Sequence, residues 1–417
     1  MAGSVAAATV DAAGTPALRG QLRRAERGRQ LAAVGLVVPL LAFMLVFFVL
    51  PIGRMLLLSI ESGEVEEAMP NAVAALRAWD GQDLPDEAAM AAFAQDLALA
   101  QKERRLAGAA KRLNAEDSGF RSLLNNTARK LPDTAPPSWR EALVGIDPAW
   151  GEHVTWARIR RASTAYTDLY LLAALDLQRD PDGNIVRVHG DQAIYLSVLG
   201  RTFWISLMVT LACLLLGYPL AYRLATLPPR QSNLLMILVL LPFWTSLLVR
   251  TGAWVVLLQK EGLVNTALQW LGLTSEPLVL IYNRFGVYVA MIHVLLPFMV
   301  LPLYSVMRGI PPVFMRAASS LGAPPFTAFR QVYMPQTLPG VGAGCLLVFI
   351  LAVGYYITPA LVGGAADQML SYFVAFYTIQ TVNWGMAAAL GTLLVVATLI
   401  LYVAYARVVG IDRMKLG

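Results

Sequence analysis

Six long apolar segments constrain the fold of this chain more than any other feature of its sequence. A helix needs about 20 mainly apolar residues to cross a bilayer, and each of these segments is long enough. They cover residues 31–60, 194–224, 234–258, 285–307, 338–361 and 385–409. Charged residues make up only 14% of the chain, whereas soluble domains carry about a quarter. The sequence therefore predicts an all-α membrane protein with six transmembrane helices.

The positions of the basic residues predict how these helices are oriented. Loops on the cytoplasmic side of a membrane carry an excess of Lys and Arg. Five arginines lie in residues 1–30, and residues 308–336 contain three arginines and no acidic residue. We expect residues 1–30 to be a cytoplasmic tail rather than a cleaved signal peptide. The loop at 308–336 and the tail at 410–417 are then cytoplasmic as well, so both termini are expected inside.

Residues 61–193 form a long insert between the first two apolar segments. The insert holds 15 Lys and Arg against 21 Asp and Glu, a net charge of −6, whereas the remaining residues hold 18 and 6. A structureless loop of this length is uncommon. Asp86 and Glu87 are typical of the start of a helical run to about residue 114, in which leucines at 99, 106 and 113 recur every seven residues. We predict a small helical domain on the extracytoplasmic side, with a turn at residues 180–183.

The sequence contains no pattern that indicates catalysis. No G-x-x-x-x-G-K-[ST] run occurs, so this chain is not expected to hold nucleotide phosphates. The glycines at 340, 342 and 344 lack a preceding strand and favour close packing of helices instead. The three histidines are scattered, and Cys213 and Cys345 lie in separate apolar segments without metal-ligand spacing. We expect no enzymatic activity, no cofactor or metal in this chain, and no nucleic-acid partner.

A few polar and aromatic residues in or beside the apolar segments are candidates for contact with a transported solute. Arg250 lies inside the third segment, six residues after Trp244. A charge at that depth either lines a pathway or pairs with a carboxylate. Tyr355, Tyr356 and Asp367 lie near an outer helix end and offer aromatic and acidic groups to a cationic solute. The aromatic residues also suit an interfacial belt.

The loop between the fourth and fifth segments carries the most specific pattern in the chain. The residues of this pattern are, in order, Arg316, Ala317, Ala318, Gly322, Val332 and Pro335. We predict a helix at about 312–321 that ends at the glycine, which suits a left-handed turn. A second short helix is expected from about residue 325, and the proline at 335 marks the return to the membrane.

This spacing resembles the cytoplasmic signature of bacterial ABC-importer permeases, in which Glu-Ala-Ala is followed at fixed distances by a glycine and a closing proline. Further motifs resemble the spermidine/putrescine branch of that family. They cover residues 217–222, 241–251, 262–265, 296–304, 340–364 and 383–385. The resemblance is strong over 194–409 and weak over the first segment. Two features differ: Arg316 stands where the family usually has glutamate, and the insert is much longer than the corresponding loop of simpler relatives.

The resemblance implies the type I ABC importer permease fold in a bacterial inner membrane, surrounded by lipid, with the helical insert between helices 1 and 2. In that family a dimer of ATPase subunits, which bind ATP and Mg²⁺, docks on the loop at 308–336. A second permease subunit completes the pathway, and a periplasmic solute-binding protein delivers the solute. We therefore expect alternating-access import of a small cationic solute, most simply a polyamine, together with a related second permease. Amino acids, opines and phosphonates are alternative solutes, and a stand-alone secondary transporter is the alternative class.

Overall fold

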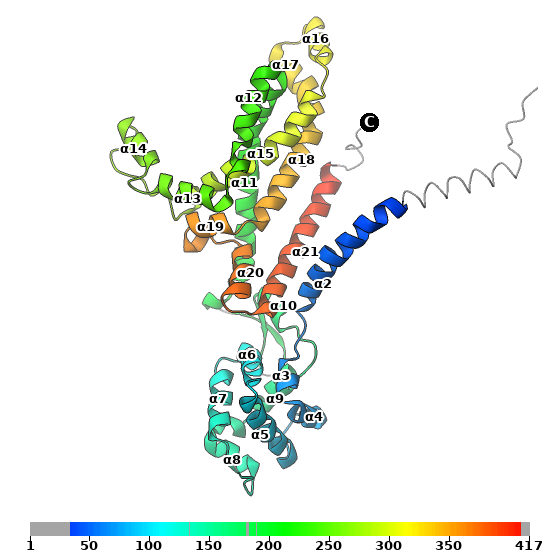
Figure 1. The fold of residues 1–417 in the computed structure, drawn as a ribbon, viewed down its shortest axis with the longest axis vertical. Helices are drawn as coiled ribbons and strands as arrows, with labels where there is room; N and C mark the ends of the chain where they lie inside the picture. Colours follow the sequence, from blue (N-terminus) through cyan, green and yellow to red (C-terminus); the bar gives the residue numbers. More distant parts are fainter. Residues whose placement is uncertain (1–33, 133, 181–182, 189, 410–417) are drawn as a thin grey trace, which may run out of the picture. The chain divides into compact units, whose positions relative to one another are not determined.

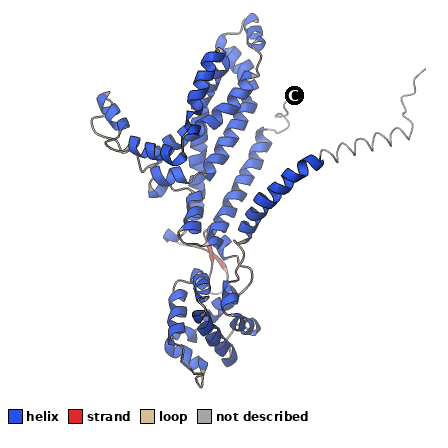
Figure 2. Ribbon diagram, viewed as in Figure 1, coloured by secondary structure: helices blue, strands red, loops and turns tan. Residues whose placement is uncertain are grey.

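The computed structural model describes residues 34–132, 134–180, 183–188 and 190–409 (Figure 1). Apart from loops, these residues are helical, with one short hairpin (Figure 2). The chain divides into two compact units, Met1–Leu57 and Leu58–Gly417. The expected cytoplasmic tails at 1–30 and 410–417 lie outside the described residues.

The described part of the first unit is one apolar helix, Val34–Leu57. It contains a π-helical stretch, η1 (Leu45–Val49), followed by α2 (Leu50–Leu57). At 1.5 Å per residue its 24 residues extend about 36 Å, enough to cross a hydrocarbon core of about 30 Å. Phe43 and Phe47 are more than half exposed, which suits a helix surrounded by lipid.

The second unit begins with the insert, a group of short helices followed by a hairpin. Phe93, Trp150 and Trp156 are fully buried at its centre, with ring centroids 4.8 to 5.2 Å apart. In the hairpin, Gln178 lies opposite Val186 in an antiparallel pair. The elements of the insert are α3 (Glu64–Ala68), α4 (Pro70–Ala78), α5 (Glu87–Lys102), α6 (Leu106–Glu116), α7 (Phe120–Lys130), α8 (Trp139–Ile146), η2 (Pro148–Gly151), α9 (His153–Ala162), α10 (Leu169–Ala174), β1 (Leu177–Arg179), β2 (Ile185–Arg187) and η3 (Gly190–Gln192).

The predicted helical run from 85 to 114 starts correctly but is interrupted. Asp86 caps α5 by accepting a hydrogen bond from the Ala89 N–H at 2.9 Å. Between α5 and α6, Arg104 takes the left-handed conformation with φ of 61°, which breaks the helix. The prediction of one helical run with its leucines every seven residues on one face is therefore wrong: the leucines at 106 and 113 are buried, whereas Leu99 is 48% exposed.

The rest of the described second unit is the membrane body, residues 195–409. In its centre, α11 (Tyr195–Thr226), α15 (Arg284–Arg308) and α18 (Met334–Gly354) run side by side (Figure 1). A Cβ on Gly344 would lie 2.8 Å from the Met299 sulfur, and one on Gly340 would lie 3.0 Å from the Val306 Cβ, so these glycines permit the predicted close packing. The elements are α11 (Tyr195–Thr226), α12 (Pro229–Leu240), η4 (Leu241–Trp244), α13 (Leu247–Leu258), α14 (Leu263–Trp270), α15 (Arg284–Arg308), α16 (Val313–Ser320), α17 (Pro325–Ala328), η5 (Phe329–Tyr333), α18 (Met334–Gly354), α19 (Ile357–Val362), η6 (Ala365–Asp367), α20 (Leu370–Ile379) and α21 (Trp384–Val409).

Among the described residues, five helices are long and apolar enough to cross a membrane, and a bent pair gives a sixth if it counts as one span. The predicted third span at 234–258 is not one straight helix, because Pro229–Trp244 and Leu247–Trp270 meet at 98°. Pro242 has no N–H for the helix ladder, and Thr245 is extended. The five continuous helices are Val34–Leu57, Tyr195–Thr226, Arg284–Arg308, Pro325–Gly354 and Trp384–Arg407.

Among its contacts with the membrane body, the insert makes two polar ones at helix ends of opposite polarity. Asp176 accepts hydrogen bonds from the N–H groups of Tyr195 and Leu196, both at 2.9 Å, at the start of α11. The Lys111 ammonium donates to the carbonyl oxygens of residues 381–382, at 2.9 and 2.6 Å, just after α20. A carboxylate at a helix N-terminus and a cation at a C-terminus both complement the helix dipole, so the two contacts hold the insert on the membrane body.

Candidate functional site

The loop between α15 and α18 starts with α16, which ends in a turn that favours glycine. The Ala318 carbonyl accepts from the Ala323 N–H, and the Ser319 carbonyl accepts from the Gly322 N–H, each at 3.0 Å. This is the Schellman arrangement of a helix C-terminus. Gly322 has φ of 84°, a conformation that costs residues with a Cβ about 1–2 kcal/mol. The predicted helix end and left-handed glycine are confirmed.

The tip of this loop exposes apolar side chains. Leu321 is 89% exposed and Phe326 is 73% exposed. Arg316 and Ala317 are exposed, and Ala318 is buried. Grouped apolar side chains on a surface indicate a contact site for another protein, so the tip can serve as a docking face.

A group of aromatic rings joins the loop to the membrane body. Phe329 and Tyr333 stack with centroids 5.6 Å apart, and both meet Tyr222 of α11 edge to face, at 5.5 and 5.3 Å. We call these three residues the aromatic joint. Along the chain, Val332 lies between Phe329 and Tyr333, and its side chain is half-buried. Pro335 is exposed in the first turn of α18. Because α18 follows η5 without a break, the joint links the loop to two central helices.

The aromatic joint was not predicted from the sequence. Tyr218 and Tyr222 are four residues apart, as are Phe329 and Tyr333, and residues at this spacing share one face of a helix. That spacing was the available signal. It does not reveal that the two pairs face each other, which depends on how α11 packs against the loop.

Arg250 lies in the first turn of α13, directly after the bend. Its Nη2 donates to the Thr245 carbonyl at 3.1 Å, and its Nε is buried without a hydrogen-bond partner among the described residues. His293 of α15 and Tyr355, just after α18, are near enough to interact electrostatically with its charge. Trp254 donates to His293 Nδ1 at 3.1 Å. The structure thus brings together Arg250 and Tyr355 from the predicted set and adds His293 and Trp254 to them.

The other predicted contact residues have different surroundings. Trp244 is 87% exposed at the bend, and Tyr356 is 37% exposed before α19. Asp367 is only 6% exposed, and its Oδ1 accepts from Arg284 Nε at 2.9 Å. Because the Asp367 carboxylate already has a cationic partner, its position favours a structural ion pair over contact with a solute.

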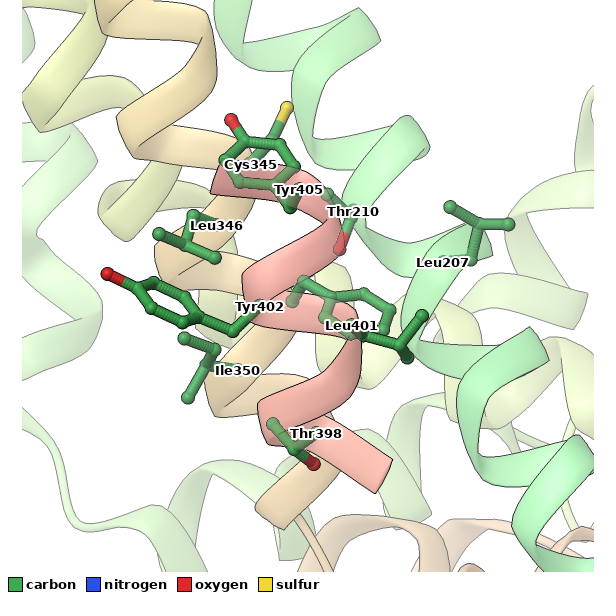
Figure 3. Close-up of a pocket in the computed structure, with 10 residues that line it drawn as sticks. Leu207, Thr210, Cys345, Leu346, Ile350, Thr398, Leu401, Tyr402 and Tyr405 are labelled. Atoms are coloured by element: carbon green, nitrogen blue, oxygen red, sulfur yellow. The ribbon is translucent and has the colours of Figure 1, made fainter. Parts of the chain in front are cut away.

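An apolar pocket of about 210 Å³ lies between α11, α18 and α21 (Figure 3). Leu207, Cys345, Leu401 and Tyr405 are among its lining residues, and none of the predicted site residues is. No charged side chain lines it, so this pocket is not a candidate site for a cationic solute.

Taken with the long apolar helices, these features define a multi-pass membrane protein, and comparisons with known proteins identify its class. The family model described as "Binding-protein-dependent transport system inner membrane component" matches residues 196–411. The spermidine/putrescine transport system permease protein PotB of Escherichia coli is 36% identical over 211 residues, which are 50% of this chain and 77% of PotB. The inner membrane ABC transporter permease protein YdcU of Escherichia coli is 32% identical over 231 residues, 51% of this chain and 71% of YdcU. A solved bacterial ABC transporter involved in alginate import aligns with a TM-score of 0.44 and 19% identity, over 55% of this chain and 82% of that chain.

The chain is a transport permease. It belongs to the family of binding-protein-dependent transport system inner membrane components, and it is the permease component of an ABC importer. The family model begins at residue 196, so it covers the membrane body and leaves out the insert.

Proposed function

We propose that this chain, paired with a related second permease, imports a small cationic solute of the polyamine class by alternating access. A separate ATPase dimer, which binds ATP and Mg²⁺, docks on the α16–α17 loop and drives the cycle. The exposed apolar tip, held by the Schellman turn at Gly322, is the observation that carries this proposal. No chemical step falls to this chain.

The charge distribution supports an orientation for the importer. The loop that carries the tip has three arginines and no acidic residue in 308–336, as is typical of the cytoplasmic side. The insert, with its net charge of −6, then lies on the periplasmic side. There it contacts the solute-binding protein, and both chain termini are cytoplasmic.

The packing of the loop supports a mechanism. Closure of the ATPase pair moves α16, and the aromatic joint passes this movement to α11 and α18. Packed helices respond to such a displacement by shifting as rigid elements. The membrane body changes direction at the bend at residues 244–246 and at the helix break at Tyr355, and Arg250 lies directly after the bend. We place the gate of the pathway there.

The solute class rests on the relatives and on the aromatic residues near this gate. PotB is named for spermidine and putrescine transport. The faces of Tyr and Trp rings attract ammonium groups, and Tyr355, Tyr356 and Trp244 offer such faces, two of them exposed. We do not assign Asp367 a contact with the cationic solute, because its carboxylate is already paired with Arg284.

Charged substitutions at the tip test the docking face. Leu321→Asp and Phe326→Asp place charges on a surface that we propose to be covered by the ATPase. We expect at least a tenfold loss of co-purified ATPase, with the thermal stability of the permease unchanged because both side chains contact solvent. Leu99→Asp, at a half-exposed position in the insert, is the matched control. Normal ATPase recovery with the tip variants would contradict the docking face.

Uptake measurements test the solute. The purified complex, reconstituted in vesicles with its binding protein outside and ATP inside, is expected to accumulate labelled putrescine or spermidine. Accumulation of an amino acid, opine or phosphonate in place of polyamines would overturn the solute assignment and leave the importer mechanism standing.

A further inference from the structure

Arg250 has no counter-ion among the described residues of this chain. The acidic residues within 195–409 are Glu261, Glu276 and Asp367. The Asp367 carboxylate is bound by Arg284, and no carboxylate of the described residues lies within 4.0 Å of the Arg250 guanidinium. An arginine inside a transmembrane segment is costly unless it pairs with an anion or a carbonyl group, and here a single carbonyl contact is made, to Thr245.

The surroundings of Arg250 add positive rather than negative potential. Arg250 lies in the first turn of α13, where the helix dipole disfavours a cation. His293 accepts a hydrogen bond at Nδ1 from Trp254, and an imidazole supplies no negative charge in its neutral or its protonated form. Tyr355 is also near Arg250, and a tyrosine hydroxyl is uncharged at neutral pH. None of these groups offers an anion to Arg250, so the described part of this chain does not neutralise its charge.

The surface around Arg250 indicates what kind of partner would supply an anion. Leu248 is 60% exposed and Val249 is 68% exposed, and Trp244 at the bend is 87% exposed. Together with Arg250 these residues form what we call the α13 surface. Lipid tails cover apolar side chains but give a guanidinium no partner, and a polyamine carries no negative charge. A protein partner with a carboxylate can cover the apolar side chains of the α13 surface and also pair with the Arg250 guanidinium.

We propose that the second permease subunit packs on the α13 surface and supplies an Asp or Glu carboxylate to Arg250. This inference rests on the proposed function, since it requires an importer with two permeases. A carboxylate pairs with the two terminal nitrogens of arginine in a bidentate manner, which fixes geometry as well as charge. The pair also neutralises Arg250 beside the proposed gate, so that the guanidinium does not repel an incoming cation.

The test combines a charge reversal with a crosslink. Arg250→Glu is expected to lower the amount of second permease that co-purifies with this chain at least tenfold, while the ATPase, which docks elsewhere, is retained. Arg230→Glu, at an exposed position in the first turn of α12, is the control and is expected to retain both partners. A compensating Lys or Arg at one acidic position of the second permease should restore its recovery with Arg250→Glu.

A photo-crosslinking residue placed at Val249 tests the contact without removing the charge. We expect an adduct with the second permease, and none from the same residue placed at Leu99 in the insert. Retention of the second permease by Arg250→Glu, or adducts of position 249 with phospholipid alone, overturns this inference and leaves the importer intact. If the unmodified chain co-purifies with no second permease, the proposed function fails, and this inference fails with it.

Discussion

Tyr222 of α11 and Phe329 of the loop meet edge to face, with ring centroids 5.5 Å apart. The contact matters because it ties the loop to α11, a helix that lies far from the loop along the chain. Tyr333, which stacks on Phe329, leads directly into α18. A force applied at α16 is therefore carried by packed rings rather than by a flexible linker.

Weakening the aromatic joint should separate ATP hydrolysis from transport. Phe329→Leu removes a ring interaction worth about 0.5–1.5 kcal/mol but leaves the exposed tip unchanged. We expect normal co-purification of the ATPase and a several-fold fall in solute imported per ATP hydrolysed. Phe203→Leu is the matched control, because it removes another ring pair of α11 and α18, with centroids 6.1 Å apart, far from the loop. Equal transport by both variants would contradict this role of the joint.

The contact between the insert and α21 should transmit the signal of the loaded binding protein. A Cβ at Gly385 would overlap the Tyr170 ring, so Gly385→Ala forces the insert away at a cost of about 1–3 kcal/mol. We expect it to abolish stimulation of ATP hydrolysis by the loaded binding protein. Gly391→Ala, in the same helix with open space around its Cβ, should leave stimulation normal.

Relief of that overlap provides a second check on the insert. Combining Gly385→Ala with Tyr170→Ala removes the ring that clashes, and part of the stimulation should return. If Gly385→Ala and Gly391→Ala behave alike, the insert does not act through α21.

The stability of the hairpin of the insert should depend on pH. The Arg179 guanidinium, hydrogen-bonded to Asp168, holds the pKa of that carboxyl below its usual range. A pKa lower in the folded than in the unfolded chain gives stability that is present above about pH 4 and is lost as the pH falls through the folded value. Because the side chains of Arg179 and Asp168 are both partly exposed, their ion pair contributes about 0–1 kcal/mol to the free energy of unfolding.

Hydrogen exchange measures this effect in the intact protein. The amides of β1 and β2, corrected for intrinsic exchange rates, should lose protection below about pH 4. In Arg179→Met the protection should already be lower at pH 7 and change little with acid. Parallel pH profiles for the two proteins would show that this ion pair does not stabilise the hairpin.

Features of local origin could be predicted from the sequence. The helix end at Gly322 follows from glycine in a left-handed turn, and the start of α5 follows from the side chain of Asp86, which binds its own helix. Apolar length predicted the continuous spans, because a helix in lipid must satisfy its own backbone. Each of these signals acts within a few residues of the chain.

Features that depend on packing could not be predicted. Pro219 and Pro297 lie inside the continuous helices α11 and α15, whereas Pro242 lies at a 98° bend, so proline alone does not locate a break. The ion pair of Asp367 with Arg284 joins two elements that no sequence pattern relates. The same holds for Tyr222 and Phe329, which meet only when α11 packs against the loop.

A pair of equivalent glycines offers the most direct test of the ATPase-coupling role of the loop. Gly272 follows α14 as Gly322 follows α16: its φ is 70°, and its N–H bonds to the Gln269 carbonyl at 3.0 Å. A Cβ added to either glycine would have open space around it. Gly322→Val and Gly272→Val therefore impose the same backbone strain, about 1–2 kcal/mol.

The measurement is the solute imported per ATP hydrolysed by the reconstituted complex carrying either variant. Our account predicts at least a fivefold loss for Gly322→Val and a near-normal ratio for Gly272→Val, with similar thermal stability in both. A normal ratio for Gly322→Val, or an equal loss in both variants, would contradict the assignment of the loop at 308–336 as the ATPase-coupling element.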